Sequence, residues 1–365
     1  MIYIEPTPYI VGLIDALRRS WDGPIEALYI TTDASQAWSL KVDGARNRVL
    51  PRGALSRWAA IWAALIRGRD RPILHLAGWG HSVLLGALLL GRSLRLPVAV
   101  ESDTGAGRAD ETWRGTVKKL LYPLLFRLPG RFLPGGTRQV RYLANFGVTK
   151  ERMTVAQMTA DVEAIRRFCA QGRDGERSAA RARWGLSADE AVALYVGRLE
   201  REKGVDLLLA AFAVAVARER KLRLAIVGDG SLRPRVEAAA ADRRIVRLGR
   251  LSGEDVLRAY IAADFVVLPS RFEPWGLVVN EAMACGLPVI VSDRVGCADD
   301  LVRHGETGLM VAAGDEAELA VAMVQLAQDE PVRRRMGQAA ERLISHWTLE
   351  NEARNIVSAW REIAR

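Results

Sequence analysis

Residues 265–292 read FVVLPSRFEPWGLVVNEAMACGLPVIVS, and the order of apolar and helix-breaking residues in this stretch decides the fold class. Its first four residues are apolar and predict a buried strand, which is followed by a loop with Pro274 and Gly276. The next apolar run predicts a helix that ends at Gly286 and Pro288, before a second apolar strand begins. A strand, a helix and another strand in this order are typical of a parallel sheet, because parallel neighbours need a crossover connection.

The same alternation of short apolar runs and longer helix-like stretches extends along the whole chain, in two series. Residues 171–178 between the series are polar and contain two glycines, as a linker or surface loop would. We therefore expect an α/β protein with two doubly wound domains, 1–175 and 176–345, and a C-terminal helix over 346–365 that packs back toward the first domain. The expected strands are 25–30, 73–76 and 98–101 in the first domain and 191–196, 222–227, 245–248, 265–268, 289–292 and 308–311 in the second.

The composition is that of a folded protein about two domains long. Of 365 residues, 50% are hydrophobic and 26% are charged, which excludes the disordered and fibrous classes. Three cysteines are too few for a disulfide framework and favour a reducing, cytoplasmic location. We expect neither a membrane span nor a secretion signal, because no run of about eighteen apolar residues occurs and the first residues lack a basic segment.

Positive charge is concentrated in the first half of the chain. The net charge is +9, and residues 1–178 hold 26 Lys and Arg against 16 Asp and Glu. Such asymmetry suggests an anionic partner, which could be a phosphorylated substrate, nucleic acid or an acidic membrane surface; the alternative is a surface generally rich in arginine. Within residues 113–131, Lys118 and Lys119 alternate with aromatic and leucine residues. This pattern suits peripheral attachment to an anionic membrane, and equally a helix on the sheet with a charged outer side.

The loop and helix inside residues 265–292 also carry candidate chemistry. Open parallel sheets bind ligands beyond the carboxyl ends of their strands, and a helix start at Gly276 and Leu277 offers N–H groups to a phosphate. Glu273 lies before that helix and Glu281 more than a turn inside it. One carboxylate can therefore reach a sugar and the other a ribose, although a glutamate in a first helical turn can also merely complement the helix dipole.

Glu273 and Glu281 are separated by seven residues, and with the Pro-Trp-Gly between them they resemble the paired-glutamate element of retaining glycosyltransferases of family four. Residues 195–206 resemble the same family's strand-exit loop, in which an Arg and a Lys five positions later hold the donor diphosphate; here these are Arg198 and Lys203. Further matching segments follow in the family's order, at 227–230, 248–251, 262–264 and 305–309.

The resemblance implies a GT-B fold, with two facing Rossmann-like domains and a cleft between them. It implies a retaining hexosyltransferase that uses a nucleotide diphosphate sugar as donor and no cofactor, with a glycan, lipid-linked or small-molecule acceptor in bacterial cell-surface or exopolysaccharide synthesis. In that family's pattern Arg198 and Lys203 hold the diphosphate, Glu281 the ribose hydroxyls and Glu273 the transferred sugar. Three further residues fall at donor positions: Gly276, Leu277 and Leu251.

The two cations also have a chemical rationale of their own. Departure of a nucleotide diphosphate leaves about one extra negative charge, which the site must neutralise. Many sugar transferases use a divalent metal held by an Asp-x-Asp element, and this sequence contains none. Fixed Arg198 and Lys203 side chains are suitable replacements, so we expect catalysis without a metal. A solvated loop in an arginine-rich chain is the alternative interpretation.

The first half matches the family less closely. Its first strand-to-helix turn, expected over residues 5–12, contains only Gly12 where many members have a glycine-rich loop near the donor phosphates. The Pro-Tyr pair that ends at Tyr9 resembles members that build bacterial surface glycans. We therefore expect Gly12 near the donor and Tyr9 on the acceptor side.

Polar residues also follow the next two expected strands of the first domain. His75 and His81 flank a short glycine-containing turn, and Glu101 and Asp103 lie at the end of the strand over 98–101. Family members often carry a His at this second position, which Asp103 takes here. We expect His81 and Asp103 on the acceptor side, although a single His near a strand is more often structural.

Other classes fit these residues less well. A glycosidase sets its two carboxyls on opposing walls, whereas Glu273 and Glu281 belong to one loop and helix. No helix-turn-helix, zinc or stacking-sheet signature accompanies the basic half, so we expect no nucleic-acid partner. A dinucleotide oxidoreductase needs Gly-x-Gly-x-x-Gly after its first strand, which is lacking. A nucleotide-sugar epimerase and a non-catalytic nucleotide-sugar binding module remain as alternatives.

Overall fold

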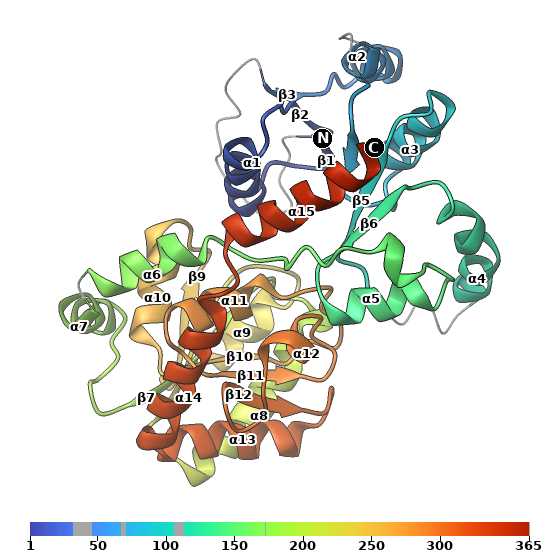
Figure 1. Cartoon of the computed structure of the whole chain (residues 1–365). Helices are drawn as coiled ribbons and strands as arrows, with labels where there is room; N and C mark the ends of the chain where they lie inside the picture. Colours follow the sequence, from blue (N-terminus) through green and yellow to red (C-terminus); the bar gives the residue numbers. More distant parts are fainter. Residues whose placement is uncertain (32–45, 67–70, 106–112, 172, 365) are drawn as a thin grey trace. The chain divides into compact units, whose positions relative to one another are not determined.

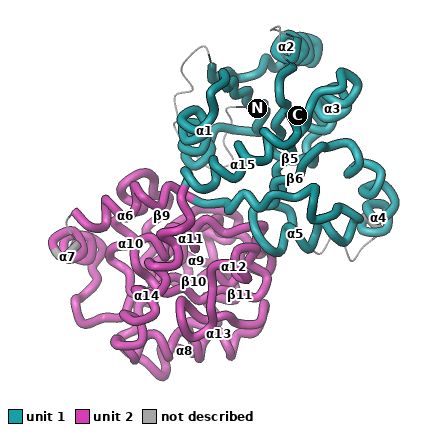
Figure 2. The backbone as a smooth tube through the Cα atoms, viewed as in Figure 1, with its two compact units in different colours: residues 1–159, 349–365 teal, residues 160–348 magenta. Residues whose placement is uncertain are grey.

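The computed structural model describes residues 1–31, 46–66, 71–105, 113–171 and 173–364, which form two compact units (Figure 1, Figure 2). Unit 1 comprises residues 1–159 and 349–365, and unit 2 comprises residues 160–348. Within the described ranges, no helix is both long and apolar enough to cross a bilayer.

Unit 1 is a parallel sheet with the strand order β3-β2-β1-β4-β5-β6 and helices on both faces. One apolar cluster joins the sheet to α2, α3, α4 and α5, and a second cluster on the other face joins it to α1 and α15. The strands are β1 (Ile2–Tyr3), β2 (Ala27–Tyr29), β3 (Asn47–Val49), β4 (Leu74–Leu76), β5 (Val98–Ser102) and β6 (Arg131–Pro134). The helices are α1 (Pro8–Ser20), α2 (Ala54–Ile66), α3 (Ser82–Ser93), α4 (Trp113–Leu125), α5 (Thr137–Ala144), the short η2 (Lys150–Arg152) and α15 (Leu349–Ala364).

Unit 2 is a second parallel sheet, with the strand order β12-β11-β10-β7-β8-β9. Its strands are β7 (Ala191–Val196), β8 (Leu222–Val227), β9 (Ile245–Gly249), β10 (Phe265–Leu268), β11 (Val289–Ser292) and β12 (Gly308–Val311). Its helices are α6 (Val162–Ala170), α7 (Arg173–Arg183), η3 (Arg201–Lys203), α8 (Val205–Arg218), α9 (Arg233–Ala239), α10 (Glu254–Ala262), α11 (Leu277–Ala284), α12 (Ala298–Leu301), α13 (Glu316–Gln328) and α14 (Glu330–Ile344).

The α/β class and the two doubly wound sheets are confirmed, and all six strands expected in the second domain are present within one residue. The expectations for the first domain missed β1, β3 and β6. β1 has only two residues, β3 is an exposed-edge Asn-Arg-Val, and β6 starts with an Arg and ends with a Pro. These strands are too short or too polar for hydrophobic periodicity to reveal them.

The linker expected over residues 171–178 is wrong, because α7 spans most of it; residue 172 lies outside the described residues. Arg177 and Arg181 of α7 each place a guanidinium nitrogen 2.8 Å from a carboxylate oxygen of Asp264. Two of the charges in that stretch, Glu176 and Arg177, are therefore paired inside unit 2, with Arg258 and Asp264. Unit 1 accordingly ends at Thr159, before the boundary expected near residue 175.

The C-terminal helix α15 belongs to unit 1, where it packs beside α1 (Figure 1). Gly12 makes this close packing feasible, because a Cβ at that position would lie 2.8 Å from Cδ1 of Leu349. Ile356 and Trp360 of α15 are buried in the same apolar cluster as Leu13 and Leu17 of α1. The end of the chain thus completes the core of the unit in which the chain begins.

Candidate functional site

The predicted donor residues follow two adjacent strands at the centre of the unit 2 sheet. Arg198 and Lys203 follow β7, while Glu273 and Gly276 follow β10, which pairs with β7. In the sheet, β8 and β9 lie on one side of β7, and β10, β11 and β12 lie on the other side. The switch point is the position between β7 and β10, where the direction of the strand order changes. Such a switch point is where open parallel sheets bind ligands, because the loops on its two sides diverge.

Lys203 and Glu273 form a mostly buried ion pair across this switch point. Nζ of Lys203 lies 2.9 Å from Oε2 of Glu273, and the two side chains are only 10% and 16% exposed. Glu202 contributes a second carboxylate oxygen 3.6 Å from the same Nζ. Removal of one partner would leave a charge with little access to water, so each side chain fixes the position of the other.

A glycine brings the two loops this close together. Gly204, directly after Lys203, has a φ of +72°, and a Cβ there would lie 2.2 Å from the carbonyl oxygen of Pro269. Arg271 then ties the loops together, since its N–H donates to the Glu202 carbonyl at 2.8 Å and its guanidinium donates to Asp206 at 2.6 Å. Burial opposes ionisation of Asp206, but the hydrogen bond and charge of Arg271 leave its pKa below the usual value.

The loop that carries Glu273 is also held from its other side. The Glu273 N–H donates to the Arg294 carbonyl at 3.2 Å, and the Gly296 N–H donates to the Glu273 carbonyl at 2.9 Å. Gly276 is the N-cap of α11 with a φ of +100°, and Leu277 is the first residue of the helix. The structure therefore places Gly276 and Leu277 at a helix start beside the ion pair, which is the geometry that suits an incoming phosphate.

Glu281 lies inside α11 with a partner of its own. The Tyr260 hydroxyl of α10 donates to Oε2 of Glu281 at 2.6 Å. Burial raises the pKa of Glu281 above its ordinary value, and the Tyr260 hydrogen bond acts in the opposite direction. The structure thus pairs Glu281 with Tyr260 and leaves it out of the contact between Lys203 and Glu273.

Arg198 and Leu251 lie at the same edge of the sheet without joining the ion pair. The Arg198 side chain is 50% exposed, and its guanidinium is 3.9 Å from Glu202. Its backbone is fixed, because the Tyr195 hydroxyl donates to the Arg198 carbonyl at 2.7 Å. Leu251 is partly buried in the loop after β9, two strands away from β7. Of the two predicted diphosphate ligands, Lys203 is therefore pre-positioned, and Arg198 has room to move.

In unit 1, one of the three acceptor-side candidates, His81, differs in role from the other two. Tyr9 is in the first turn of α1; burial raises its pKa, and the negative charges of Asp103 and Glu101 add to this rise. His81 is the N-cap of α3, where its Nδ1 accepts the Val83 N–H at 3.1 Å. A structural role thus accounts for His81, whereas Tyr9 and Asp103 share one electrostatic environment.

The expected location of Gly12 in a strand-to-helix turn is wrong. The turn ends at Thr7, whose hydroxyl oxygen accepts the Ile10 N–H and caps α1. Gly12 lies inside α1 and faces Leu349 of α15. The packing of α1 against α15 explains why position 12 has no side chain. The helix begins before this glycine because Pro8, its first residue, favours a helix start.

A buried polar cluster, which we call the His75 cluster, lies within the unit 1 sheet, on strands β1, β4 and β5 and against α15. Nε2 of His75 lies 2.7 Å from Oε1 of Glu101, and the Tyr3 hydroxyl donates to the same oxygen at 2.8 Å. The Trp360 indole N–H donates to Nδ1 of His75 at 3.1 Å. Since Nδ1 accepts, the neutral ring must carry its proton on Nε2 and donate it to Glu101.

Glu352 of α15 is a further buried carboxyl near this cluster, and it is only 5% exposed. Burial raises its pKa well above the ordinary value, the negative charge of Glu101 adds to this rise, and a hydrogen bond from the Thr159 backbone opposes it. The sequence analysis did not find Tyr3, Glu352 or the Trp360 contact. The available signal was a His in the middle of a short apolar strand, because such a residue needs buried partners.

Comparison with known proteins gives a family match within unit 2 and similar chains of known name. Residues 176–343 match the family Glycosyl transferases group 1, so unit 2 is a domain of that family. The D-inositol 3-phosphate glycosyltransferase of Nocardia farcinica is 36% identical over 57% of this chain and 47% of its own length. The alpha-D-kanosaminyltransferase of Streptomyces kanamyceticus is 33% identical over 52% of this chain and 50% of its own length. The chain thus matches about half the length of these curated relatives.

Among solved structures, the chain is similar to Anabaena Alr3699/HepE in complex with UDP. The TM-score is 0.78, with 17% identity and 99% of each chain covered. At this identity the likeness shows the fold, which is GT-B with two Rossmann-like domains.

Proposed function

We propose that this chain, with its group 1 glycosyl transferase domain, transfers a sugar from a nucleotide diphosphate sugar to an acceptor. The observation that carries the proposal is the buried contact between Lys203 and Glu273 at the switch point between β7 and β10. It supplies a fixed cation and a fixed carboxylate on neighbouring loops. The cation can neutralise the charge of a leaving diphosphate, and the carboxylate can accept hydrogen bonds from the hydroxyls of a sugar.

In the proposed mechanism the site acts by positioning and by charge. Lys203 and Arg198 bind the diphosphate, and the N–H groups at Gly276 and Leu277 add the positive end of α11. Lys203 then forms an ion pair with a phosphate oxygen, and its ion pair with Glu273 weakens. The Glu273 carboxylate can then accept hydrogen bonds from the sugar hydroxyls. Both groups are in place before the reaction, so little reorganisation is needed as charge develops on the leaving group.

Glu281 is the proposed ligand of the ribose hydroxyls. Tyr260 holds one of its carboxylate oxygens, which fixes the direction of the side chain. Burial raises the pKa of Glu281, and ribose hydroxyl groups that donate hydrogen bonds to the carboxylate would lower that pKa again.

The finer features of the reaction are also part of the proposal. We propose retention by a same-face route, in which the leaving phosphate oxygen takes the acceptor proton, with fixed cations in place of a divalent metal. The relatives named for D-inositol 3-phosphate favour a small phosphorylated acceptor, whereas the family resemblance favours a glycan or lipid-linked acceptor in surface-polysaccharide synthesis. A cytoplasmic location follows from the cysteine usage and stays a prediction.

A donor screen tests the function. UDP and a panel of nucleotide sugars are added to the purified chain, and thermal stabilisation and nucleotide release are measured with and without chelator and acceptor. A bound donor stabilises the folded state in proportion to RT ln(1 + [L]/Kd). We expect stabilisation by one nucleotide class, release that depends on acceptor, and no effect of chelator.

Lys203→Gln should abolish the stabilisation, whereas the control Lys221→Gln, which removes a 65% exposed lysine paired with Asp189, should retain it. Donor conversion without acceptor would indicate an epimerase. Binding without release under all acceptors would indicate a binding module. Chelator-sensitive turnover would overturn the role of the fixed cations.

A further inference from the structure

Unit 1 exposes apolar side chains on helices that otherwise carry only positive charge. α2, α3 and α4 all pack on the same face of the sheet, through Ile61, Leu84 and Tyr122 among others. Their sequences contain no Asp or Glu. Residues 44–150 as a whole hold 18 Lys and Arg against 5 Asp and Glu, so the net positive charge of the protein lies in this segment.

The outer side of α4 is an apolar stripe. Val117, Leu120, Leu121 and Leu124 are 41%, 71%, 56% and 60% exposed, and their spacing places them on one face of the helix. Tyr122 and Phe126 face the other way and stack on Trp79 under the helix. α4 therefore uses a different set of apolar residues for the core, and the outer stripe is additional to what folding needs.

The outer side of α2 also exposes apolar side chains. Leu55, Trp62 and Ile66 are 90%, 44% and 54% exposed, at spacings of seven and four residues, while Ile61 and Leu65 are buried. Between α2 and α3 lies a shallow apolar groove. It is lined by Trp58, Ala59, Trp62, Gly86, Leu89 and Leu90. Gly86 leaves room for the Trp58 ring, because a Cβ there would be 2.4 Å from that ring.

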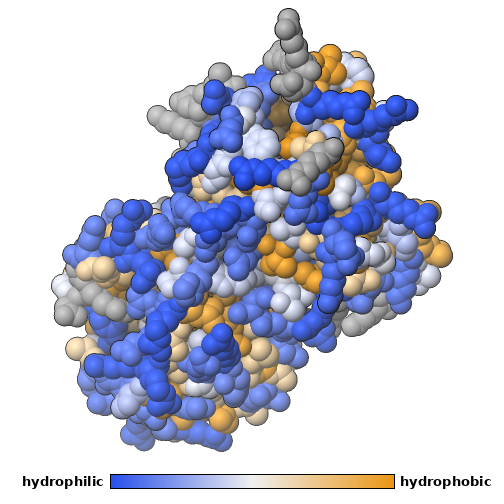
Figure 3. All heavy atoms as spheres, in the orientation of Figure 1, coloured by the Kyte–Doolittle hydropathy of each residue, from blue (hydrophilic) through white to orange (hydrophobic). Residues whose placement is uncertain are grey.

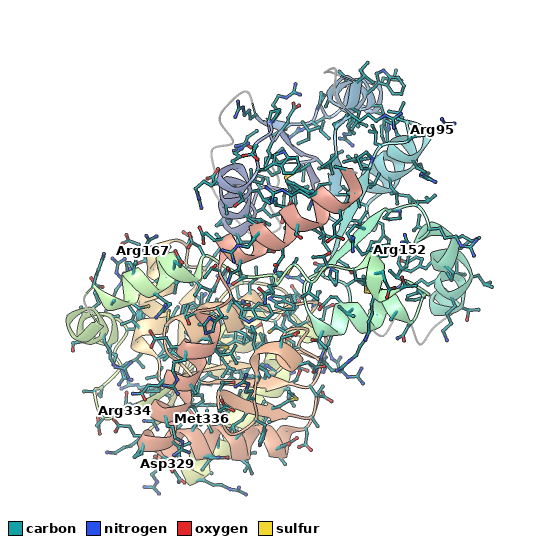
Figure 4. All side chains as sticks on the ribbon, in the orientation of Figure 1. Arg95, Arg152, Arg167, Asp329, Arg334 and Met336 are labelled. Atoms are coloured by element: carbon teal, nitrogen blue, oxygen red, sulfur yellow. The ribbon has the colours of Figure 1, made fainter. Side chains whose placement is uncertain are left out.

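Exposed cations border these apolar side chains. Lys119 and Arg127 are exposed beside the α4 stripe, and Arg92 and Arg95 are exposed at the end of α3. Figure 4 shows Arg95 directed away from the ribbon, and Figure 3 shows apolar side chains gathered around α2 and α3 among hydrophilic ones. Monomeric soluble proteins rarely expose contiguous apolar patches of this kind without a partner.

We propose that the outer side of α2, α3 and α4 is a docking surface for a bilayer that contains anionic phospholipid. Leucine and tryptophan side chains on this surface enter the boundary between headgroups and acyl chains, while Lys119, Arg127, Arg92 and Arg95 meet the lipid phosphates. This binding is independent of the sugar transfer proposed above.

The charge distribution argues against the other occupants of such a surface. A second copy of the chain would bring two strongly positive surfaces together, and like charges across an interface are repulsive. Nucleic acid would pair with the cations, but exposed leucines on three helices add nothing to contacts with phosphates. An anionic bilayer satisfies both the apolar side chains and the cations.

Vesicle sedimentation tests the proposal. The full chain is mixed with vesicles of phosphatidylcholine, or of phosphatidylcholine with phosphatidylglycerol, at low and high salt. We expect strong binding only to the anionic vesicles, weakened by salt. Lys119→Gln with Arg127→Gln should weaken partitioning by about fivefold for each charge, and Leu120→Ser with Leu124→Ser by at least about tenfold.

Matched control variants lie in unit 2. Arg218→Gln with Arg220→Gln removes the same charge from exposed positions, and Val214→Ser with Val321→Ser removes side chains that are 39% and 52% exposed. Both controls should bind vesicles like the parent chain, and all variants should keep the parent melting temperature because every changed side chain is already exposed. Equal loss in variants and controls, or no binding to anionic vesicles, would overturn the proposal. A lipid-independent dimer that Leu120→Ser with Leu124→Ser dissociates would instead assign this surface to a second copy of the chain.

Discussion

Unit 1 and unit 2 have the same strand order, with the first strand of each at the centre, yet the polar groups near these central strands differ in chemistry and in place. In unit 2 a buried cation, Lys203, meets the carboxylate of Glu273. In unit 1 the neutral ring of His75 donates to Glu101, and a second buried carboxyl, Glu352, lies near it. The unit 2 pair lies on loops beyond the strands, where open sheets bind ligands, whereas the unit 1 groups lie within the strands and against α15.

The two units also distribute charge differently. Unit 2 pairs several of its arginines with its own carboxylates, as Arg177 and Arg181 do with Asp264. Unit 1 leaves Arg92 of α3 and Arg95 just after this helix exposed, and α3 contains no acidic residue. Unit 1 therefore has positive charge spread over a surface, whereas part of the positive charge of unit 2 is paired within the fold. The following variants test this contrast, in order of decreasing effect.

The largest effect is expected for Glu273→Gln. Nucleotide release should fall by about 10²–10³-fold, the usual cost of losing one pre-positioned polar group at a reacting centre. UDP affinity should be kept or increased, because Lys203 no longer shares its charge with a carboxylate. Calorimetric titration and turnover check the two quantities. Glu237→Gln, which changes a 41% exposed residue paired with Arg233, should alter neither; loss of UDP affinity in Glu273→Gln would contradict the assignment.

Asp264→Asn should destabilise unit 2 by about 3 kcal/mol, as expected when one partner of a buried charge network is removed. Asp264 accepts from Arg177, Arg181 and the Val192 N–H at 2.7–2.8 Å. Thermal and urea unfolding measure the change. The more exposed Asp255→Asn, on the neighbouring α10, should cost at most about 1 kcal/mol. Equal stability of the two variants would mean that α7 does not anchor unit 2.

Trp360→Phe should cost about 1–3 kcal/mol, because Nδ1 of His75 would lose its donor in a buried site. The effect belongs to unit 1, so UDP affinity should match that of the parent chain. Urea unfolding and calorimetry are the measurements, with the 44% exposed Trp62→Phe as the control. A large change in UDP affinity would show that the His75 cluster is coupled to the donor site.

The smallest expected effect is an increase in stability. Glu352→Gln should stabilise the protein at pH 8 by about 0.5–2 kcal/mol, the range of typical stabilising substitutions. The folded state raises the pKa of Glu352 above its unfolded value of 4.5, so parent stability falls as pH rises from about 4.5 toward the folded pKa. The advantage of the variant should therefore shrink as pH is lowered to 5. Unfolding at the two pH values checks it, and an advantage that grows at low pH would contradict the buried-carboxyl interpretation.

The extent to which the sequence predicted the fold differed between the units for a physical reason. Strands in unit 2 have four to six residues and are apolar almost throughout, so their pattern alone located them. In unit 1, β1 has two residues and β3 carries polar ones, so neither gives a hydrophobic pattern that can be recognised. Helix α7 was read as a linker, since a charged helix and a solvated loop have the same composition until the partners are known.

The candidate site divides in the same way. The sequence by itself determined the residue types at the switch point of unit 2, because the spacing within each of the two loops, after β7 and after β10, is a local property. Only the tertiary structure decided that Lys203 contacts Glu273 while Arg198 stays half exposed, that Gly12 serves helix packing, and that His75, Glu101 and Trp360 meet. These contacts join residues far apart in the chain, and which pairs meet depends on the packing of whole elements, which no local pattern encodes.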